Sequence, residues 1–320
     1  MSAGSILRQI TRYYPLNRPR RRLLATLPDV AADNGEFSIK SGLRLRAYPG
    51  GADYICKQAY WFGDFDPWVD RTLARLARPG DTAIDIGANI GTTTLCLARS
   101  VGTAGRVISF EPLPSNFAML RSNIEANGFQ HVDAWPLALS DHTGTGRMLE
   151  SEGQAGQARM EDVAFDSLGK QLWLGPGIGK RITVGTSTFD QWVERQQIRS
   201  ASVCKIDVEG YEETVLRGMH HSLQKQLIQA FVIERHVAWN TVHDSIFDLL
   251  RESGYCIYRI DKGLWGVLYS PLGSRPSGQP SHDFVAVLED SEATQRIGPW
   301  IQRKEAAHGT FLTLTLGPKS

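Results

Sequence analysis

Two short segments of this sequence carry residues suited to ligand binding: a glycine-containing turn and, about twenty positions later, an acidic residue at the end of a strand. The first, Asp81–Gly91, reads Asp-Thr-Ala-Ile-Asp-Ile-Gly-Ala-Asn-Ile-Gly and leads into a helix that we expect to begin near Thr92. The second is the apolar strand 107–110, which is followed at once by Glu111. Glycines let a backbone approach a ligand, a helix N-terminus offers free N–H groups, and a carboxylate binds ribose hydroxyls. The two segments therefore predict a crevice for an adenosine ligand.

The turn also indicates which adenosine ligand is favoured. A dinucleotide site prefers Gly-x-Gly-x-x-Gly, because its middle glycine admits a pyrophosphate. In the segment Gly87-Ala-Asn-Ile-Gly91 that position is Asn89, whose side chain would meet the pyrophosphate. A phosphate-free sulfonium nucleoside with an amino-acid tail fits better, although Glu111 would serve either ligand class. A nicotinamide-dependent oxidoreductase remains an alternative.

A second group of polar residues follows two later strands. Lys205-Ile-Asp-Val-Glu-Gly210 stands at the end of one expected strand, and Glu234-Arg-His236 ends the next. Carboxyl ends of parallel strands form the ligand crevice of an open α/β sheet, so these side chains should gather there. Helix capping would explain Asp207 or Glu209 alone but not four polar groups. Asp207, Glu209 and Glu234 could also hold a magnesium ion, since oxygen ligands suit it, but we do not favour a metal site.

Composition excludes several classes of function. The chain has 320 residues, 42% of them apolar and 22% charged, which is ordinary for a soluble globular protein. Its net charge of +1 and the absence of an Asn-Pro-Pro-aromatic motif disfavour a nucleic-acid partner. No apolar run approaches the roughly eighteen residues of a membrane span. The cysteines at 56, 96, 204 and 256 are isolated, which predicts reduced thiols and a cytoplasmic protein.

We divide the chain into four parts. Residues 1–35 are expected to be an irregular basic lead-in, either a solvated arm or a peripheral attachment to an acidic membrane or partner. Residues 36–78 suggest N-terminal strands at 37–40, 43–48 and 54–56, and a helix at 67–77, packed on the core. Residues 79–290 form the regular domain, with an insertion at 142–182, and residues 291–320 are a tail that we do not assign.

Strands and helices alternate in the regular domain, which predicts a doubly wound, mostly parallel sheet. The expected strands are 83–86, 107–110, 132–139, 202–206, 230–234, 255–260 and 284–288, and the expected helices begin near 92 or span 115–127, 188–197, 212–223 and 245–253. The insertion, rich in Gly, Ser and Gln, is typical of a hairpin or lid, with strands near 147–150 and 181–184. Trp173 is our candidate for a lid over the acceptor.

Together these segments resemble the FkbM family of S-adenosylmethionine-dependent methyltransferases. The matching blocks are Asp85–Gly91, Glu111–Asn116, Ala138–Asp141, Lys205–Gly210 and Glu234, within about residues 60–260. The resemblance implies a class I, Rossmann-like fold with a seven-stranded sheet whose last strand runs antiparallel. It also implies O-methylation of a hydroxyl on a sugar, a glycan or a secondary metabolite.

The resemblance further assigns roles to individual residues. It implies that S-adenosylmethionine is bound by Asp85, Gly87, Ala88, Asn89 and Gly91 at its methionine part, by Glu111 at its ribose, and by Ser140 and Asp141 beside its adenine. Phe65-Asp66-Pro67 stands where the family often has Glu-Pro. Transfer of the methyl requires a base for the acceptor hydroxyl, and the candidates are Asp207, Glu209 and His236, with Asp207 nearest the methyl.

The acceptor is expected to be a small molecule or a glycan. A non-catalytic module that uses the same fold to bind a glycan or a protein remains a second alternative.

Overall fold

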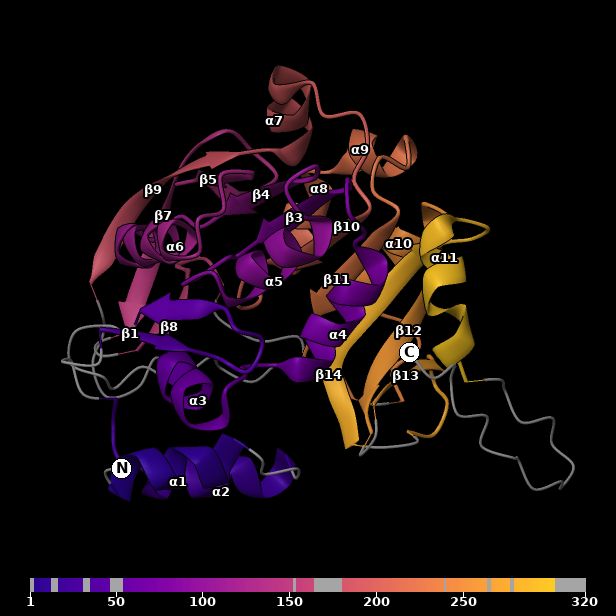
Figure 1. Ribbon diagram of the computed structural model, residues 1–320. Helices are drawn as coiled ribbons and strands as arrows, with labels where there is room; N and C mark the ends of the chain where they lie inside the picture. The colour runs from indigo at the N-terminus through magenta and orange to yellow at the C-terminus, as the bar shows by residue number, and fades with distance from the viewer. Residues whose placement is uncertain are drawn as a thin grey trace, which may run out of the picture.

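The computed structural model describes residues 3–12, 17–30, 35–46, 54–151, 154–163, 180–238, 240–263, 266–276 and 279–302. Its centre is an eight-stranded sheet with the order β13-β12-β14-β11-β10-β3-β4-β5 (Figure 1). These strands are β3 (Thr82–Ile86), β4 (Arg106–Phe110), β5 (Val132–Trp135), β10 (Val203–Ile206), β11 (Ala230–Glu234), β12 (Tyr255–Lys262), β13 (Val267–Pro271) and β14 (Gln279–Leu288).

The directions of the strands confirm the expected doubly wound sheet. β5, β4, β3, β10 and β11 pair in parallel, while β14 pairs antiparallel with β11 and with β12. The seven expected strands are therefore present and the last one in the chain is antiparallel. An eighth strand that we did not predict, β13, adds to the edge and pairs antiparallel with β12.

Helices cover both faces because strand residues alternate between two apolar clusters. Ala83 of β3 belongs to the cluster beneath α4 (Pro67–Leu76), α5 (Thr92–Val101) and α11 (Glu292–Ile297). Ile84 belongs to the opposite cluster, beneath α7 (Phe189–Gln196), α8 (Glu212–Arg217), α9 (His220–Gln224) and α10 (Ser245–Glu252). On the first face, α6 (Pro114–Ala126) packs beside α5 and against the N-terminal strands β1 (Glu36–Ser38) and β2 (Arg44–Arg46).

The expected third strand, 132–139, is divided between two sheets. β5 remains in the central sheet, whereas β6 (Ala138–Leu139) joins a four-stranded sheet with the order β6-β9-β7-β8. The insertion supplies the other strands of this sheet, β7 (Gly144–Ser151), β8 (Gln154–Met160) and β9 (Arg181–Ser187). The two expected strands, 147–150 and 181–184, lie in β7 and β9, which pair antiparallel. β8, which we did not predict, pairs antiparallel with β7. Trp173, our lid candidate, lies outside the described residues.

The N-terminal part differs from the prediction. The lead-in is not irregular, since it contains α1 (Ala3–Arg12) and α2 (Asn17–Thr26), which lie beneath α3 (Tyr54–Phe62) in Figure 1. Residues 54–56 begin this α3 helix rather than a strand, and Ile55, Cys56 and Phe62 are buried in it. A run of three apolar residues does not distinguish the two structures, which explains the error.

Two further differences concern later helices. The expected helix 212–223 is interrupted at Gly218, where a Cβ atom would lie 2.0 Å from the Ser140 carbonyl oxygen. The unassigned tail contains α11 and a short 3₁₀ turn at Gly298–Trp300. Within the described residues, no helix has both the length and the apolar character that a membrane span requires.

Candidate active site

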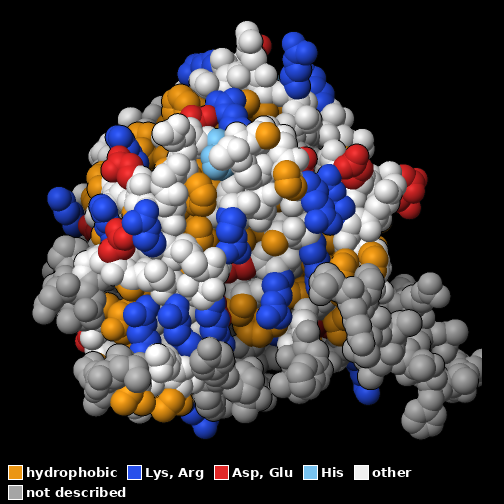
Figure 2. Space-filling model, in the orientation of Figure 1, with side chains coloured by type: hydrophobic (Ala, Val, Ile, Leu, Met, Phe, Trp, Pro, Cys, Tyr) orange, Lys and Arg blue, Asp and Glu red, His pale blue; other side chains and the backbone are white. Residues whose placement is uncertain are grey.

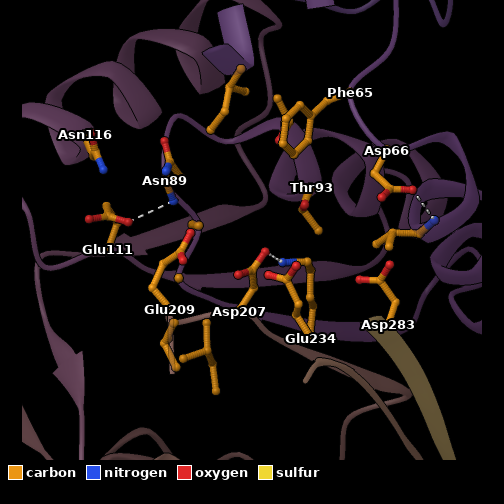
Figure 3. Close-up of a pocket in the computed structure, with 18 of the residues that line it drawn as sticks. Phe65, Asp66, Asn89, Thr93, Glu111, Asn116, Asp207, Glu209, Glu234 and Asp283 are labelled. Carbon is orange, nitrogen blue, oxygen red and sulfur yellow. Dashed lines mark hydrogen bonds and ion pairs between the residues drawn. The ribbon is translucent and has the colours of Figure 1, made fainter. Parts of the chain in front are cut away.

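A cavity of about 700 Å³ lies along the carboxyl ends of β3, β4, β10 and β11. Figure 3 shows Asp207, Glu209 and Glu234 beside one another, with Glu111 and Asn89 at one end and Asp66 and Asp283 at the other. The cavity is lined by both groups of residues that the sequence singled out. The residues that line the cavity include Gly87, Ala88, Asn89, Thr92, Thr93, Glu111, Leu137, Ala138, Leu139, Met148, Met160, Lys205, Asp207, Glu209, Glu234, His236, Lys262, His282 and Asp283.

The glycines of the turn are required by the protein's own packing. Gly87 has a φ of +83°, and a Cβ atom there would lie 1.8 Å from the Asp207 carbonyl oxygen. Gly91 has a φ of +98°, and its Cβ would lie 2.8 Å from Leu120 Cδ1. Gly91 itself is not among the residues that line the cavity. We had expected these glycines to admit a ligand, but at both positions the close neighbour is another part of the chain.

Glu111 is fixed in place by two backbone N–H groups. Its Oε2 accepts from Asn89 N at 2.8 Å and its Oε1 accepts from Leu113 N at 2.9 Å. Burial raises the pKa of Glu111 to about 7, although these N–H groups act in the opposite direction. A carboxylate oxygen can accept a further hydrogen bond. Glu111 therefore lines the cavity with carboxylate oxygens that keep the capacity to accept further hydrogen bonds.

Asp85 lies behind the turn rather than in the cavity lining. Its side chain is fully buried, and Oδ2 accepts from Thr94 Oγ1 at 2.6 Å. Its Oδ1 has no hydrogen-bond partner among the described residues. Burial raises the pKa of Asp85, while the Lys205 ammonium opposes the shift. Asp85 thus ties the end of β3 to the first turn of α5 and is not part of the cavity lining.

Ser140 and Asp141, which we expected beside the adenine, are not among the cavity-lining residues. Ser140 is fully buried, and its Oγ lies 3.1 Å from Tyr211 OH. Asp141 Oδ1 accepts from His142 Nδ1 at 2.9 Å. The three residues that precede Ser140 line the cavity instead, and Met148 and Met160 of the hairpin extend this apolar wall. The assignment of Ser140 and Asp141 to the adenine stays a prediction, and the described cavity wall lies directly before them in the chain.

The acids at the ends of β10 and β11 lie close to one another and to the Lys205 ammonium (Figure 3). Lys205, nearly buried, donates from Nζ to Asp207 Oδ2 at 2.7 Å. The Glu234 carboxyl lies beside that of Asp207 (Figure 3). Burial and the charge of Asp207 raise the pKa of Glu234 well above its ordinary value. Burial alone would raise the pKa of Asp207, but Lys205 and Glu234 outweigh it and lower it.

Neither Asp207 nor Glu209 caps α8, whose N-cap residue, Tyr211, makes no side-chain capping hydrogen bond. Glu212, a residue we did not single out, holds the loop before the helix instead: its Oε1 accepts from Gly210 N at 3.0 Å and from Val208 N at 3.3 Å. Glu209 has a left-handed backbone, with a φ of 52°, and its side chain remains accessible at the cavity. The surrounding cavity walls, which partly shield its carboxyl from water, and the charges of Asp207 and Glu212 raise the pKa of Glu209 to about 8.

His236 lies in the same cavity as Asp207 and Glu209, so the three candidate catalytic residues are brought together. Its Nε2 lies 3.5 Å from Glu234 Oε1, and its ring centroid lies 4.4 Å from that of His282. His282, on β14, is a cavity residue that the sequence analysis missed.

Lys262 joins two more carboxylates at the far end of the cavity. Its Nζ lies 2.9 Å from Asp66 Oδ2 and 3.5 Å from Asp283 Oδ2. Asp66 also caps α4, because its Oδ1 accepts from Trp68 N at 3.1 Å and Val69 N at 3.2 Å. Burial raises the pKa of Asp283 to about 6, although Lys262 opposes the shift. Neither Lys262 nor Asp283 carried a local sequence signal.

The structure provides no grouping of three or more His, Cys, Asp or Glu side chains suited to a metal ion, as far as the described residues extend. The magnesium site considered for Asp207, Glu209 and Glu234 is thus not among the arrangements found.

Comparison with known proteins gives a consistent result. A family model described as the methyltransferase FkbM domain matches residues 85–257. The hexuronic acid methyltransferase AglP of Haloferax volcanii is 27% identical over 218 residues, which cover 68% of this chain and 75% of that protein. The 31-O-demethyl-FK506 methyltransferase FkbM of Streptomyces tacrolimicus is 30% identical over 205 residues, which cover 56% of this chain and 74% of that protein.

Proposed function

The chain belongs to the FkbM methyltransferase family, and on that premise we propose that its cavity binds S-adenosylmethionine and an acceptor hydroxyl side by side. The chain is an O-methyltransferase, and the acceptor that we propose is a sugar, a glycan or a secondary metabolite. The names of the two relatives support this range, since one refers to a hexuronic acid and the other to a demethylated FK506. The observation that carries the proposal is that Glu111 and the Asp207–Glu209 acids line one cavity.

The residues present fit this cofactor. Glu111 offers carboxylate oxygens to a ribose diol, and the wall that contains Leu139, Met148 and Met160 suits a flat adenine ring. Thr92 and Thr93 line the cavity at the N-terminus of α5, where no described side chain caps the helix, so N–H groups remain for a carboxylate. When bound, S-adenosylmethionine supplies a methyl group on a good leaving group.

Among the three candidate bases we propose Glu209. Asp207 is held by the Lys205 ammonium at 2.7 Å and has a lowered pKa, so it is a weak base and serves to position its neighbours. Glu209 is accessible at the cavity and its pKa is about 8, near the pH at which a general base is most effective. His236 is the second candidate because it lies at the same cavity, 3.5 Å from Glu234.

We also infer that the protein works in a reducing compartment, the cytoplasm. All four cysteines are free, and Cys56, Cys96 and Cys204 are buried, which supports this assignment. Burial raises the pKa of Cys96 and Cys204 well above the ordinary value, so both thiols stay protonated.

Two measurements on the purified chain test the function. Calorimetry should detect binding of S-adenosylhomocysteine, and this binding should fall sharply in Glu111→Ala, while NAD gives no heat. Incubation with labelled methyl donor and an extract of the host should then label an acceptor that can be identified. The proposal fails if the folded chain binds neither S-adenosylmethionine nor its demethylated product.

A further inference from the structure

The N-terminal helix α1 packs on the domain with its polar side. Thr11 is 2% exposed, and its Oγ1 donates to the Trp61 carbonyl oxygen at 2.5 Å. Arg8 Nε donates to the Tyr60 carbonyl oxygen at 3.0 Å, and Arg12 Nη2 donates to the Ser38 carbonyl oxygen at 2.7 Å. The inward face of α1 is therefore made of hydrogen-bonding side chains.

The outward face of α1 is apolar. Ile6, Leu7 and Ile10 are 47%, 37% and 63% exposed, and they account for three of the five large hydrophobic residues that are exposed in the described part of the chain. A surface helix of a globular protein has the reverse arrangement, with its apolar stripe toward the core. Exposed apolar side chains that cluster in this way mark a surface that contacts another partner.

The segment that carries this face is rich in arginine, although Arg20 is buried and pairs with Asp64 at 2.6 Å. Residues 1–28 contain six arginines and no acidic residue, whereas the whole chain has a net charge of +1, so the remainder is net negative. Arg8 and Arg12 bond to neutral carbonyl oxygens, which leaves their charges uncompensated by those bonds, and Arg22 is exposed. Figure 2 shows basic and hydrophobic side chains together at the lower end of the molecule, where Figure 1 places α1 and α2.

We propose that α1 and α2 dock the protein on an anionic membrane surface. Ile6, Leu7 and Ile10 enter the headgroup region, and the exposed Arg22 binds a lipid phosphate. Apolar insertion and basic charge are the two signals that together give peripheral binding to anionic lipid. A second copy of the chain is a poor occupant, because two faces with this excess of arginine repel each other.

The helix α2 connects the docking region with the cavity wall. Leu24 and Leu27 of α2 pack on Trp61 and Phe62 of α3. Arg20 of α2 and Tyr54, Ile55 and Gln58 of α3 line the cavity itself. Docking therefore brings part of the cavity wall to the membrane surface, which points to an acceptor hydroxyl carried on a lipid-linked molecule. This consequence rests on the proposed function, whereas docking itself does not.

Co-sedimentation of the full chain with vesicles tests the docking. We expect binding to phosphatidylcholine vesicles that contain phosphatidylglycerol, weaker binding at high salt, and little binding to phosphatidylcholine alone. The double variant Ile6→Ser/Ile10→Ser should weaken binding by about tenfold or more. Arg22→Gln should weaken it less. The matched control is Val242→Ser, which removes a side chain that is 40% exposed elsewhere and should bind as the unmodified chain does.

Several results would overturn the docking proposal. The first is an absence of binding to anionic vesicles. The second is a loss of vesicle binding in Val242→Ser as large as that in Ile6→Ser/Ile10→Ser. A dimer that Ile6→Ser/Ile10→Ser converts to a monomer would assign the face to a second copy. Capture of polyglutamate without vesicle binding would assign it to an acidic protein. Vesicle binding that needs removal of residues 303–320 would assign it to that segment. Calorimetry with S-adenosylhomocysteine on the same samples tests the proposed function separately, because Ile6 and Ile10 are remote from that ligand's expected contacts.

Discussion

Gly87→Ala tests the close approach between the cofactor turn and the end of β10. The added Cβ would lie 1.8 Å from the Asp207 carbonyl oxygen, and contacts under 3.0 Å essentially never occur, so β3 and β10 must separate by roughly 1 Å. A left-handed alanine costs about 1 to 2 kcal/mol, and forcing apart packed segments costs about 1 to 3 kcal/mol more. The free energy of unfolding should therefore fall by about 2 to 5 kcal/mol.

Gly128→Ala is the matched control. Gly128 has a φ of +68°, but nothing lies within 4 Å of the Cβ that an alanine would add. The free energy of unfolding of this variant should therefore fall only by the cost of a left-handed alanine backbone, about 1 to 2 kcal/mol. In thermal melts we expect a shift of a few degrees for Gly128→Ala and on the order of 10 °C for Gly87→Ala. Gly87→Ala should also weaken S-adenosylhomocysteine binding, measured by calorimetry. Equal melting temperatures and equal affinities in the two variants would refute the reasoning.

Three further predictions concern the ionisable groups of the cavity. With a Glu209 pKa of about 8, kcat/KM should rise by about tenfold between pH 7 and 9 as the basic form accumulates, and Glu209→Gln should remove that rise; an identical profile in the variant would exclude Glu209 as the base. Glu111 binds its proton more tightly in the folded state, with a pKa of about 7 against 4.5, so stability should fall by up to about 3 kcal/mol as pH rises from 4.5 to above 7. Melts of Glu111→Gln should lack this slope, and an unchanged slope would contradict the assignment. Asp207→Asn removes the nearest charge partner of the buried Lys205, so we expect the free energy of unfolding to fall by about 3 kcal/mol. Turnover should fall sharply while affinity for S-adenosylhomocysteine is nearly retained. Denaturant unfolding and calorimetry check this, and unchanged stability and turnover would count against it.

The sequence predicted the central sheet because its strands are short apolar runs that end at glycines or acids. The same rule brought Asp207, Glu209 and His236 to one cavity, since parallel strands present their carboxyl ends at one edge. It did not predict that the chain leaves the central sheet after Trp135, where β6 pairs with β9 and brings Ala138 and Leu139 to the cavity wall. That pairing depends on a strand more than forty residues away and has no local signal.

Other missed features also depend on contacts that are distant in sequence. Lys262 and Asp283 reach the cavity only because β12 and β14 lie beside β11, an order that composition does not encode. The helix α1 was not predicted because its anchors, such as Thr11 on the Trp61 carbonyl, join segments fifty residues apart. Glu212 was overlooked for a different reason, since an acid in the first turn of a helix is common and favourable in any case.

The added strand β13 has a consequence for how two chains could associate. It covers the flank of β12 that would otherwise be open, and its own outer side is engaged at Tyr269 by Ile301 and by Gln302, whose N–H donates to the Tyr269 carbonyl at 2.8 Å. Exposed flanks are the places where sheets of separate molecules fuse. If the central sheets of two chains formed one continuous sheet, they would therefore have to pair through β5, the strand at the opposite edge.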